Sequence, residues 1–599
     1  MTRAGGVAYD LVIRNGTIYD GRGADPFVGD VAVAGDSIAA VGDLGARRGR
    51  TEVDASGLAV APGFINMLSW ANESLIADGR SQSDIRQGVT LEVLGEGWSM
   101  GPLNEAMKQE MLERQGDIKY DIEWTTLGEY LQYLVRRGIS PNVASFVGAS
   151  TVRIYVLGYE DRPPTAEELD RMRGLVRQAM AEGAVGLSSA LLYAPACYAA
   201  PDELIALAGV VAECGGLYIS HIRNEGSGLL EALDELIEVA DRTGVAAEIY
   251  HLKVSGRSNW PKLDEAVARI EAARARGLRL TADMYTYTAS STGLDATMPP
   301  WVQVGGHRAW IERLKDPAIR ERLKREMVTP SDAWESTYQA AGSADNILLI
   351  DFKSEALKPL TGKTLAEVAA LRGQSPEETV MDLVIEDDSD VGCVFFTMSE
   401  ENIRRQIALP WVSFGSDGAS PAAEGVFLKS STHPRAYGNF ARLLGKYVRQ
   451  ERLIPWPEAI RRLTWFPAQN LKLPRRGALL PGFFADIVVF DPDTIQDRAT
   501  FDRPHQYATG VVHVFVNGVP VIEHGEHTGA RPGRVVHGPG WRGQARPTTF
   551  GGRHSGSMWM STWPMFGSLA RSRCSAWSAR RWASLIDSAR SARQWSVTS

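Results

Sequence analysis

The sequence predicts an α/β fold, a (β/α)8 barrel of the TIM type with a small β-sandwich domain built from both ends of the chain. Strand-like and helix-like segments alternate through the middle of the chain, which is typical of a mostly parallel sheet. Short strands separated by tight-turn residue pairs occupy both ends. Several central strands are followed at once by polar side chains, as expected where strand ends line the mouth of a barrel.

Length and composition agree with a large globular protein. A chain of 599 residues suits a barrel with an appended domain. The hydrophobic fraction of 44% and the charged fraction of 23% are ordinary for soluble proteins. The four cysteines include no close-spaced pair, which argues against both a disulfide framework and a zinc ribbon.

Charge and apolar patterning argue against several classes of partner. A net charge of −8 gives no support for nucleic-acid binding, which favours a basic stripe. No apolar stretch is long enough to span a bilayer, and the N-terminus lacks the apolar core of a signal peptide. We therefore expect a cytoplasmic protein without nucleic-acid or membrane partners, and its oligomeric state is left open.

The two ends of the chain have the texture of β-hairpins. Strand 10–13 precedes Asn15-Gly16, and strand 485–490 lies in a similar pattern near the other end. Such turn pairs supply the positive φ that tight hairpins need. Because chain termini often lie close together, residues 1–61 and 475–543 are predicted to form one split β-sandwich. Two separate small β domains are the alternative.

The central region, residues 62–474, is predicted to form the barrel. A helix start at Thr165 has an N-cap hydroxyl followed by acids, and apolar positions then recur at helical spacing towards Met180. Further strands and helices alternate along the chain, at 186–193, 217–221, 229–239, 247–251, 263–273, 278–283 and 412–417. The stretch 289–348 fits this rhythm poorly and is predicted to be an insertion over the mouth.

Two histidines are the most informative residues. His221 and His251 each end a strand, and they are thirty residues apart, about one strand–helix–strand repeat. In a barrel of such repeats both side chains reach the same mouth. Asp283 and Asp417 end two other predicted strands. Histidines and acids at strand ends point to a hydrolytic metal site.

The last segment, 544–599, differs from the rest in composition. It is rich in Arg, Ser and Trp, and it contains a single acid, Asp587. We expect a disordered extension, or a read-through of the natural stop in another frame. Binding of nucleic acid or membrane by this basic aromatic tail is the alternative. The segment is excluded from the predicted fold.

Several motifs resemble a known family. The segments 9–16, 61–65 and 480–488 resemble the amidohydrolase superfamily. More narrowly, a series of internal motifs resembles its N-acyl-D-amino-acid deacylase (D-aminoacylase) branch, namely 186–188, 220–225, 251–253, 415–418, 433–438 and 525–533. The resemblance covers nearly everything except the last segment, and the order of the motifs makes it specific.

The resemblance implies metal-dependent hydrolysis of the amide bond of N-acyl-D-amino acids, giving a carboxylate and a free D-amino acid. It implies one divalent metal ion, zinc first, with manganese or cobalt as alternatives. A bound cation lowers the pKa of its water and polarises the scissile carbonyl. An aspartate then moves the proton from the water to the leaving nitrogen.

The resemblance also assigns roles to residues. His221 and His251 match the metal ligands, and Asp417 matches the acid–base. Six further residues are candidates for contacts to the substrate carboxylate and amide, namely Lys253, Tyr193, Tyr285, Ser291, His433 and Arg435. Each has a bland alternative, since lysine and arginine are common in solvated surfaces and tyrosine is common in packing.

Two departures from the family pattern matter. Where the family has a His-x-His pair after the first barrel strand, this chain has Leu68 and Trp70. The family's cysteine ligand is also missing, and Glu96 stands at or beside its position. Two histidines and one glutamate form a known catalytic zinc set, and loss of the soft sulfur makes manganese or cobalt more admissible. Glu96 is therefore the predicted third ligand.

Two rival functions remain at this stage. The same site with a reshaped pocket would suit a cyclic amide or an N-carbamoyl amino acid. A barrel that has lost its chemistry and only binds a ligand is the other alternative, which the missing His-x-His pair favours. The joint presence of His221, His251 and Asp417 argues against it, because packing alone gives no reason for that combination.

Overall fold

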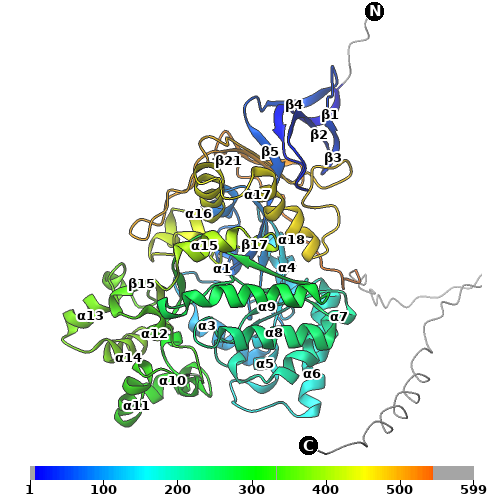
Figure 1. Cartoon of the computed structure of the whole chain (residues 1–599). Coiled ribbons are helices and arrows are strands. Elements are labelled where there is room, and N and C mark those ends of the chain that lie inside the picture. Colours follow the sequence, from blue (N-terminus) through cyan, green and yellow to red (C-terminus); the bar gives the residue numbers. More distant parts are fainter. Residues whose placement is uncertain (1–6, 332, 544–599) are drawn as a thin grey trace, which may run out of the picture. The chain divides into compact units, whose positions relative to one another are not determined.

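The computed structural model describes residues 7–331 and 333–543 (Figure 1). The segment 544–599, predicted to be a disordered extension, lies outside these described residues. Within them, no helix combines the length and apolar character that crossing a membrane requires.

The centre of the fold is a set of parallel strands. They are β6 (Phe64–Ser69), β7 (Val89–Leu94), β8 (Asn142–Ser145), β9 (Val147–Gly148), β10 (Gly186–Ala190), β11 (Leu217–His221), β12 (Ala246–Ile249), β13 (Leu280–Met284) and β17 (Val412–Phe414). They pair in the orders β6-β7-β8 and β9-β10-β11-β12-β13-β17. A parallel bridge between Ser69 and Gly418 joins the two outermost strands, β6 and β17.

These strands are buried because both of their faces are covered. Every residue of β6, β7, β10 and β11 is buried, as expected for a parallel sheet with helices outside it. The covering helices include α4 (Leu127–Arg137), α5 (Ala149–Leu157), α6 (Ala166–Glu182), α7 (Pro201–Glu213), α8 (Leu229–Thr243) and α9 (Leu263–Ala275). Helices α6 to α9 pack in chain order, each on the next (Figure 1). The predicted α/β class is confirmed.

Helix α6 illustrates how local sequence sets the boundaries. Thr165 accepts a hydrogen bond from the backbone of Glu168, and the Glu168 side chain returns one, forming a capping box. Gly183 ends the helix with a φ of 115°, a conformation that favours glycine. The predicted helix start at Thr165 and the loss of helical period after Gly183 are both confirmed.

A second sheet joins the two ends of the chain. Its strands are β1 (Val7–Ile18), β2 (Phe27–Ala34), β3 (Ser37–Gly42), β4 (Arg48–Asp54), β5 (Ala59–Pro62), β18 (Ile487–Phe490), β19 (Val511–Val516), β20 (Val519–Glu523) and β21 (Glu526–His527). The N-terminal and C-terminal strands meet where β5 pairs with β18, with Val60 opposite Val489. Asn15, in one of the predicted turn pairs, has a φ of 59°.

A third unit interrupts the parallel strands between β13 and β17. Its antiparallel sheet consists of β14 (Ser290–Gly293), β16 (Gly392–Phe395) and β15 (Ile347–Asp351), in that order. Its helices are α10 (His307–Leu314), α11 (Pro317–Val328), α12 (Thr337–Ala341), α13 (Leu365–Arg372) and α14 (Pro376–Asp387). They enclose a hydrophobic core of their own. This unit reaches β16, well past residue 348, where the insertion was expected to end.

The remaining helices connect these units. They are α1 (Asn72–Ala77), α2 (Gln82–Ile85), α3 (Glu105–Arg114), α15 (Glu400–Ile407), α16 (Arg435–Arg442), α17 (Trp456–Leu463) and α18 (Trp465–Asn470). Two of them matter for the site, because α3 ends at Arg114 and α16 begins at Arg435.

Candidate metal centre

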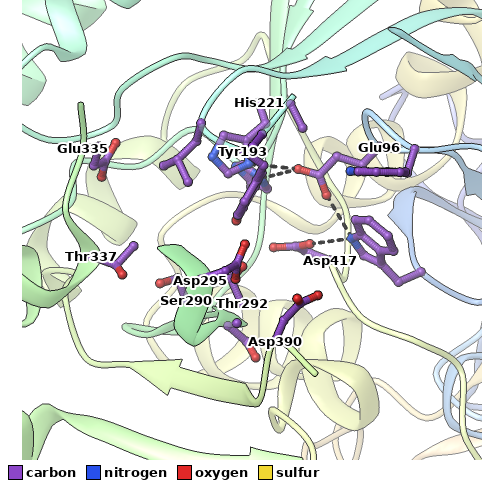
Figure 2. A pocket seen from close by; sticks show the side chains of 18 of the residues that line it. Glu96, Tyr193, His221, Ser290, Thr292, Asp295, Glu335, Thr337, Asp390 and Asp417 are labelled. Atoms are coloured by element: carbon purple, nitrogen blue, oxygen red, sulfur yellow. Dashed lines mark hydrogen bonds and ion pairs between the residues drawn. The ribbon is translucent and has the colours of Figure 1, made fainter. Parts of the chain in front are cut away.

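Three buried side chains converge at the carboxyl ends of the parallel strands. Glu96 follows β7, His221 ends β11 and His251 follows β12. Glu96 Oε1 lies 3.1 Å from His221 Nδ1 and 2.8 Å from His251 Nε2. One ligand atom from each residue lies within 4.8 Å of the other two. The structure thus brings together all three residues that the sequence predicts as metal ligands, of which Glu96 and His221 are labelled in Figure 2.

The chemistry of this donor set fits a divalent cation. Two imidazoles and one carboxylate match a catalytic zinc set and leave a position open. His221 Nε2 is buried without a hydrogen-bond partner among the described residues. His221, His251 and Glu96 are each at most 5% exposed, and buried ionisable groups of this kind are normally paired or coordinate a metal.

The backbone at two of the site residues is in an uncommon conformation. His251 has a φ of 34° and Asp417 has a φ of 49°, in the left-handed region that residues other than glycine seldom adopt. Neighbouring strands fix both. His251 N donates to Asp283 Oδ1 at 2.9 Å, and Asp417 N donates to the Leu68 carbonyl at 2.9 Å. Such conformations are concentrated at functional sites.

The second nitrogen of His251, Nδ1, is contacted by Lys253 Nζ at 2.6 Å and by Glu225. Glu225 Oε1 lies 3.1 Å from His251 Nδ1 and accepts a hydrogen bond from Lys253 Nζ at 2.7 Å. Burial and Lys253 lower the pKa of His251, but Glu96 and Glu225 outweigh them and raise this pKa to about 10. A carboxylate in this position orients a ligating imidazole. The sequence analysis did not single out Glu225, although it lies in the same motif as His221.

Asp417 faces the triad from the end of β17 and is held from two sides. Arg435 Nη1 lies 2.8 Å from Asp417 Oδ2. The indole nitrogen of Trp70 donates to Asp417 Oδ1 at 3.2 Å and to Glu96 Oε2 at 2.9 Å. Burial raises the pKa of Asp417, although the Arg435 guanidinium opposes that rise. Trp70 is a second contact residue that was not predicted.

The site opens into a cavity of about 530 Å³, an ordinary size for a small-molecule site. Besides the triad and Asp417, five of the predicted substrate-contacting residues line it, namely Tyr193, Lys253, Ser291, His433 and Arg435. The Tyr193 ring meets the His221 ring edge to face, with centroids 5.2 Å apart.

Tyr285 is placed differently from the other candidates. It is not among the residues that line the cavity. Its hydroxyl donates to Met398 Sδ at 3.5 Å, and its ring lies 4.6 Å from the Arg435 guanidinium and 5.7 Å from Lys253 Nζ. Tyr285 thus packs against the two cations that line the cavity, and its contact with substrate stays a prediction.

The polar side-chain atoms of Ser291 and His433 form hydrogen bonds with backbone groups of the cavity wall. Ser291 Oγ donates to the Cys393 carbonyl at 2.8 Å, within the β14–β16 pair. His433 Nε2 lies 3.0 Å from the Ala289 carbonyl, and His433 Nδ1 accepts from Arg435 N at 3.0 Å. Burial and the Arg435 charge lower the pKa of His433 well below its usual value. A neutral His433 therefore anchors the start of α16.

The outer part of the cavity is acidic. Figure 2 shows Asp295, Asp390 and Glu335 around the opening. Asp390 pairs with Arg114 at 2.6 Å. Burial and then Asp390 raise the pKa of Asp295 to about 7. Burial and then Glu225 raise the pKa of Glu335, which accepts from the Glu225 backbone, to about 8. None of these acids was predicted, because all three belong to the inserted unit.

Comparison with known proteins agrees with this geometry. A model of the amidohydrolase family matches residues 51–522, and the chain belongs to this family. A D-aminoacylase from Alcaligenes xylosoxydans xylosoxydans is 33% identical over 540 residues, which are 90% of this chain and 99% of that protein. The resemblance to the N-acyl-D-amino-acid deacylase branch is confirmed.

Two solved structures share the fold at similar identity. One is an N-acyl-D-glutamate deacylase from Bordetella bronchiseptica, complexed with zinc and a phosphonate mimic of the tetrahedral intermediate. It is 32% identical with a TM-score of 0.74, covering 88% of this chain and 99% of that one. The other is a D-aminoacylase described as having a binuclear metal centre with one-metal activation and second-metal attenuation. It is 32% identical with a TM-score of 0.74, covering 88% of this chain and all of that one.

Proposed function

We propose that this protein hydrolyses the amide bond of N-acyl-D-amino acids to a carboxylate and a free D-amino acid, using one divalent metal ion. The observation that carries the proposal is the meeting of Glu96, His221 and His251 with Asp417 in one cavity. It is supported by similarity to deacylases that extends over 88–90% of the chain.

Glu96, His221 and His251 would hold the ion. When bound, a divalent cation supplies an activated water and polarises the scissile carbonyl. The imidazoles must be neutral to bind it, so binding would displace any proton that Glu96 and Glu225 favour on His251. Zinc is the first choice for this donor set, and manganese or cobalt are alternatives because no thiolate takes part.

Asp417 would be the acid–base. Its carboxylate faces the triad, and burial raises its pKa towards the pH at which a carboxylate can both take and return a proton. Arg435 on one oxygen and Trp70 on the other keep it in one orientation. Asp417 would take a proton from the attacking water and deliver it to the leaving nitrogen.

Two cations would bind the substrate carboxylate. Lys253 and Arg435 line the cavity close to the triad. Arg435 Nε is buried without a hydrogen-bond partner among the described residues, and a guanidinium suits a carboxylate well. Tyr193 would lie against the substrate beside His221, while Ser291 and His433 shape the same wall.

We also propose a domain arrangement that follows from the strand pairings. Residues 62–474 would form a (β/α)8 barrel, supported by the parallel order from β6 to β17 and the Ser69–Gly418 bridge. Residues 1–61 and 475–543 would form one β-sandwich domain, supported by the pairing of β5 with β18. The insertion would run from about 289 to Phe395.

The test is hydrolysis by the purified protein of paired N-acetyl-D- and N-acetyl-L-amino acids. Asp417→Asn is the matched blank, because it keeps the shape of the side chain and removes its basicity. We expect turnover of the D series by the wild type and loss of turnover in the variant. Turnover confined to the L series, to a hydantoin or to an N-carbamoyl amino acid would overturn the proposal, as would full activity in Asp417→Asn.

A further inference from the structure

Trp70 lies between the two carboxylates of the site. It follows directly after β6, and its indole nitrogen donates to Glu96 Oε2 at 2.9 Å and to Asp417 Oδ1 at 3.2 Å. Both hydrogen bonds are drawn as dashed lines that end on Glu96 and Asp417 in Figure 2. A single N–H is therefore shared by the candidate metal ligand and the candidate acid–base.

Two carboxylate oxygens that both lie within 3.2 Å of one nitrogen mark a natural place for a cation. An imidazole at this position would add a third ligand, because a neutral histidine has a nitrogen lone pair. The indole nitrogen is a donor only and offers no lone pair to a metal. Its N–H presents the positive end of a dipole to both carboxylates. It therefore partly offsets their mutual repulsion, as a bound cation would.

Leu68, two residues earlier, gives no alternative ligand. Its apolar side chain is 1% exposed, and its carbonyl accepts the backbone N–H of Asp417. Within the described residues, the only group of three metal-ligating side chains that meet closely is Glu96, His221 and His251. A related D-aminoacylase is described as having a binuclear centre in which a second metal attenuates activity.

We propose that the Trp70 indole takes the place of a second cation, which restricts this site to one metal ion and positions Asp417. The proposal rests on the proposed function, since it assumes that the triad holds an ion. Glu96 would help to hold that ion while its Oε2 keeps the hydrogen bond from the indole. Asp417 would stay free of metal and available for proton transfer, and Trp70 would be a positioning residue.

The first experiment counts metal ions. The wild-type protein is equilibrated with excess zinc, freed of unbound metal and analysed for zinc per chain by mass spectrometry, with calorimetric titration alongside. We expect one zinc in the wild type and two in Trp70→His, whose new imidazole would join Glu96 Oε2 and Asp417 Oδ1. Trp98→Phe is the matched control, because Trp98 lines the same cavity without bonding these two side chains. It should keep one zinc.

The second experiment separates positioning from stability. Trp70→Phe keeps an aromatic ring and loses the N–H together with part of the ring volume, so the stability of the variant is measured alongside its activity. We expect kcat to fall roughly tenfold with little change in KM, as for loss of one hydrogen bond to a charged group, while one zinc stays bound. Excess zinc should inhibit Trp70→His and leave wild-type turnover unchanged.

The outcomes are distinguishable. Two zinc ions in the wild type, one in Trp70→His, or an unchanged kcat in Trp70→Phe would each overturn the role of Trp70. A wild-type protein that binds no zinc, or binds it without hydrolysing any N-acyl-D-amino acid, would overturn the proposed function instead. The wild-type zinc count tests the proposal even if a variant fails to fold.

Discussion

Replacing Glu225 with glutamine tests whether the metal centre depends on the groups behind its ligands. Glu225 Oε1 lies 3.1 Å from His251 Nδ1 and 2.7 Å from Lys253 Nζ. The change alters none of the three proposed metal ligands. Glutamine keeps the shape of the side chain and removes its charge. The effect on metal affinity therefore reports on how Glu225 orients and polarises His251.

The expected magnitude follows from the two contacts. Loss of a carboxylate behind a ligating histidine costs about 10- to 100-fold in metal affinity, which is about 1.4 to 2.7 kcal/mol. Lys253 is 3% exposed and would lose its counter-ion, so the free energy of unfolding should fall by up to about 3–5 kcal/mol. Zinc affinity is measured by competition with a chromophoric chelator, and stability by denaturant unfolding of the zinc-loaded protein.

Glu335→Gln is the matched control for this change. Glu335 accepts from the backbone of Glu225 but makes no ion pair within the described residues. Burial and Glu225 raise its pKa to about 8, so at neutral pH it is mostly protonated and the substitution removes little charge. We expect zinc affinity within about threefold of the wild type. Unchanged affinity in Glu225→Gln, or an equal loss in Glu335→Gln, would refute the reasoning.

Three further predictions concern selectivity, metal preference and pH. Arg114 offsets the charge of Asp390, but at pH 8 Asp295, whose pKa is raised to about 7, is mostly ionised. At that pH N-acetyl-D-leucine should have a kcat/KM roughly tenfold above that of N-acetyl-D-glutamate, and Asp295→Asn should narrow this ratio. Glu96→Cys should shift relative affinity from manganese towards zinc in metal competition, whereas Glu96→Ala should leave less than one ion per chain. Burial raises the pKa of Glu248 to about 7. The folded state therefore binds the proton of Glu248 more tightly than the unfolded state does. The free energy of unfolding due to this group falls as pH rises from about 4.5 to 7. Glu248→Gln should remove that fall, about 3 kcal/mol at most, as measured by denaturant unfolding across this range.

The strand-end residues of the site could be predicted because the fold itself brings them together. In parallel strands, residues such as His221, His251 and Asp417 point into one mouth whatever the loops do. Glu96 was predicted in another way, from the family resemblance, because it stands at or beside the position of the family's cysteine ligand. The positions of the strand-end residues along the chain are enough to predict that they lie close together, because neighbouring parallel strands end at the same edge of the sheet.

The partners of these residues depend on details that local sequence does not carry. Glu225 reaches His251 only because the chain after β12 turns through a φ of 34° at His251. Trp70 reaches both Glu96 and Asp417 through a side chain whose direction is set by packing. The packing of the Tyr285 ring against Arg435 and Lys253 depends on such details as well.

The end of the insertion could not be recognised from local sequence, because it is set by strand pairing between residues far apart in the chain. Strand β16 pairs with β14, and Ser291 stands opposite Val394 about one hundred residues later. Neither strand is long, and neither shows a clear alternation of apolar and polar residues. Each is therefore hard to recognise from its own sequence without knowing that it pairs with the other. The part of the inserted unit beyond residue 348 also carries Asp390, which lines the cavity.

The cavity therefore has two parts, which come from different structural units and tolerate substitution to different extents. The inner part is built from the ends of parallel strands, where a shift of Glu96, His221 or His251 would disturb strands that are buried on both faces. The outer part comes from the inserted unit, which has a core of its own, and from Arg114 at the end of α3, a helix whose Met107 packs in the main core. Substitutions in the outer part can alter charge and shape without moving the metal ligands. We therefore expect the choice of amino-acid side chain to be set there and the amide chemistry to be set at the strand ends, so that Asp295→Asn should change substrate preference while zinc content stays at the wild-type value.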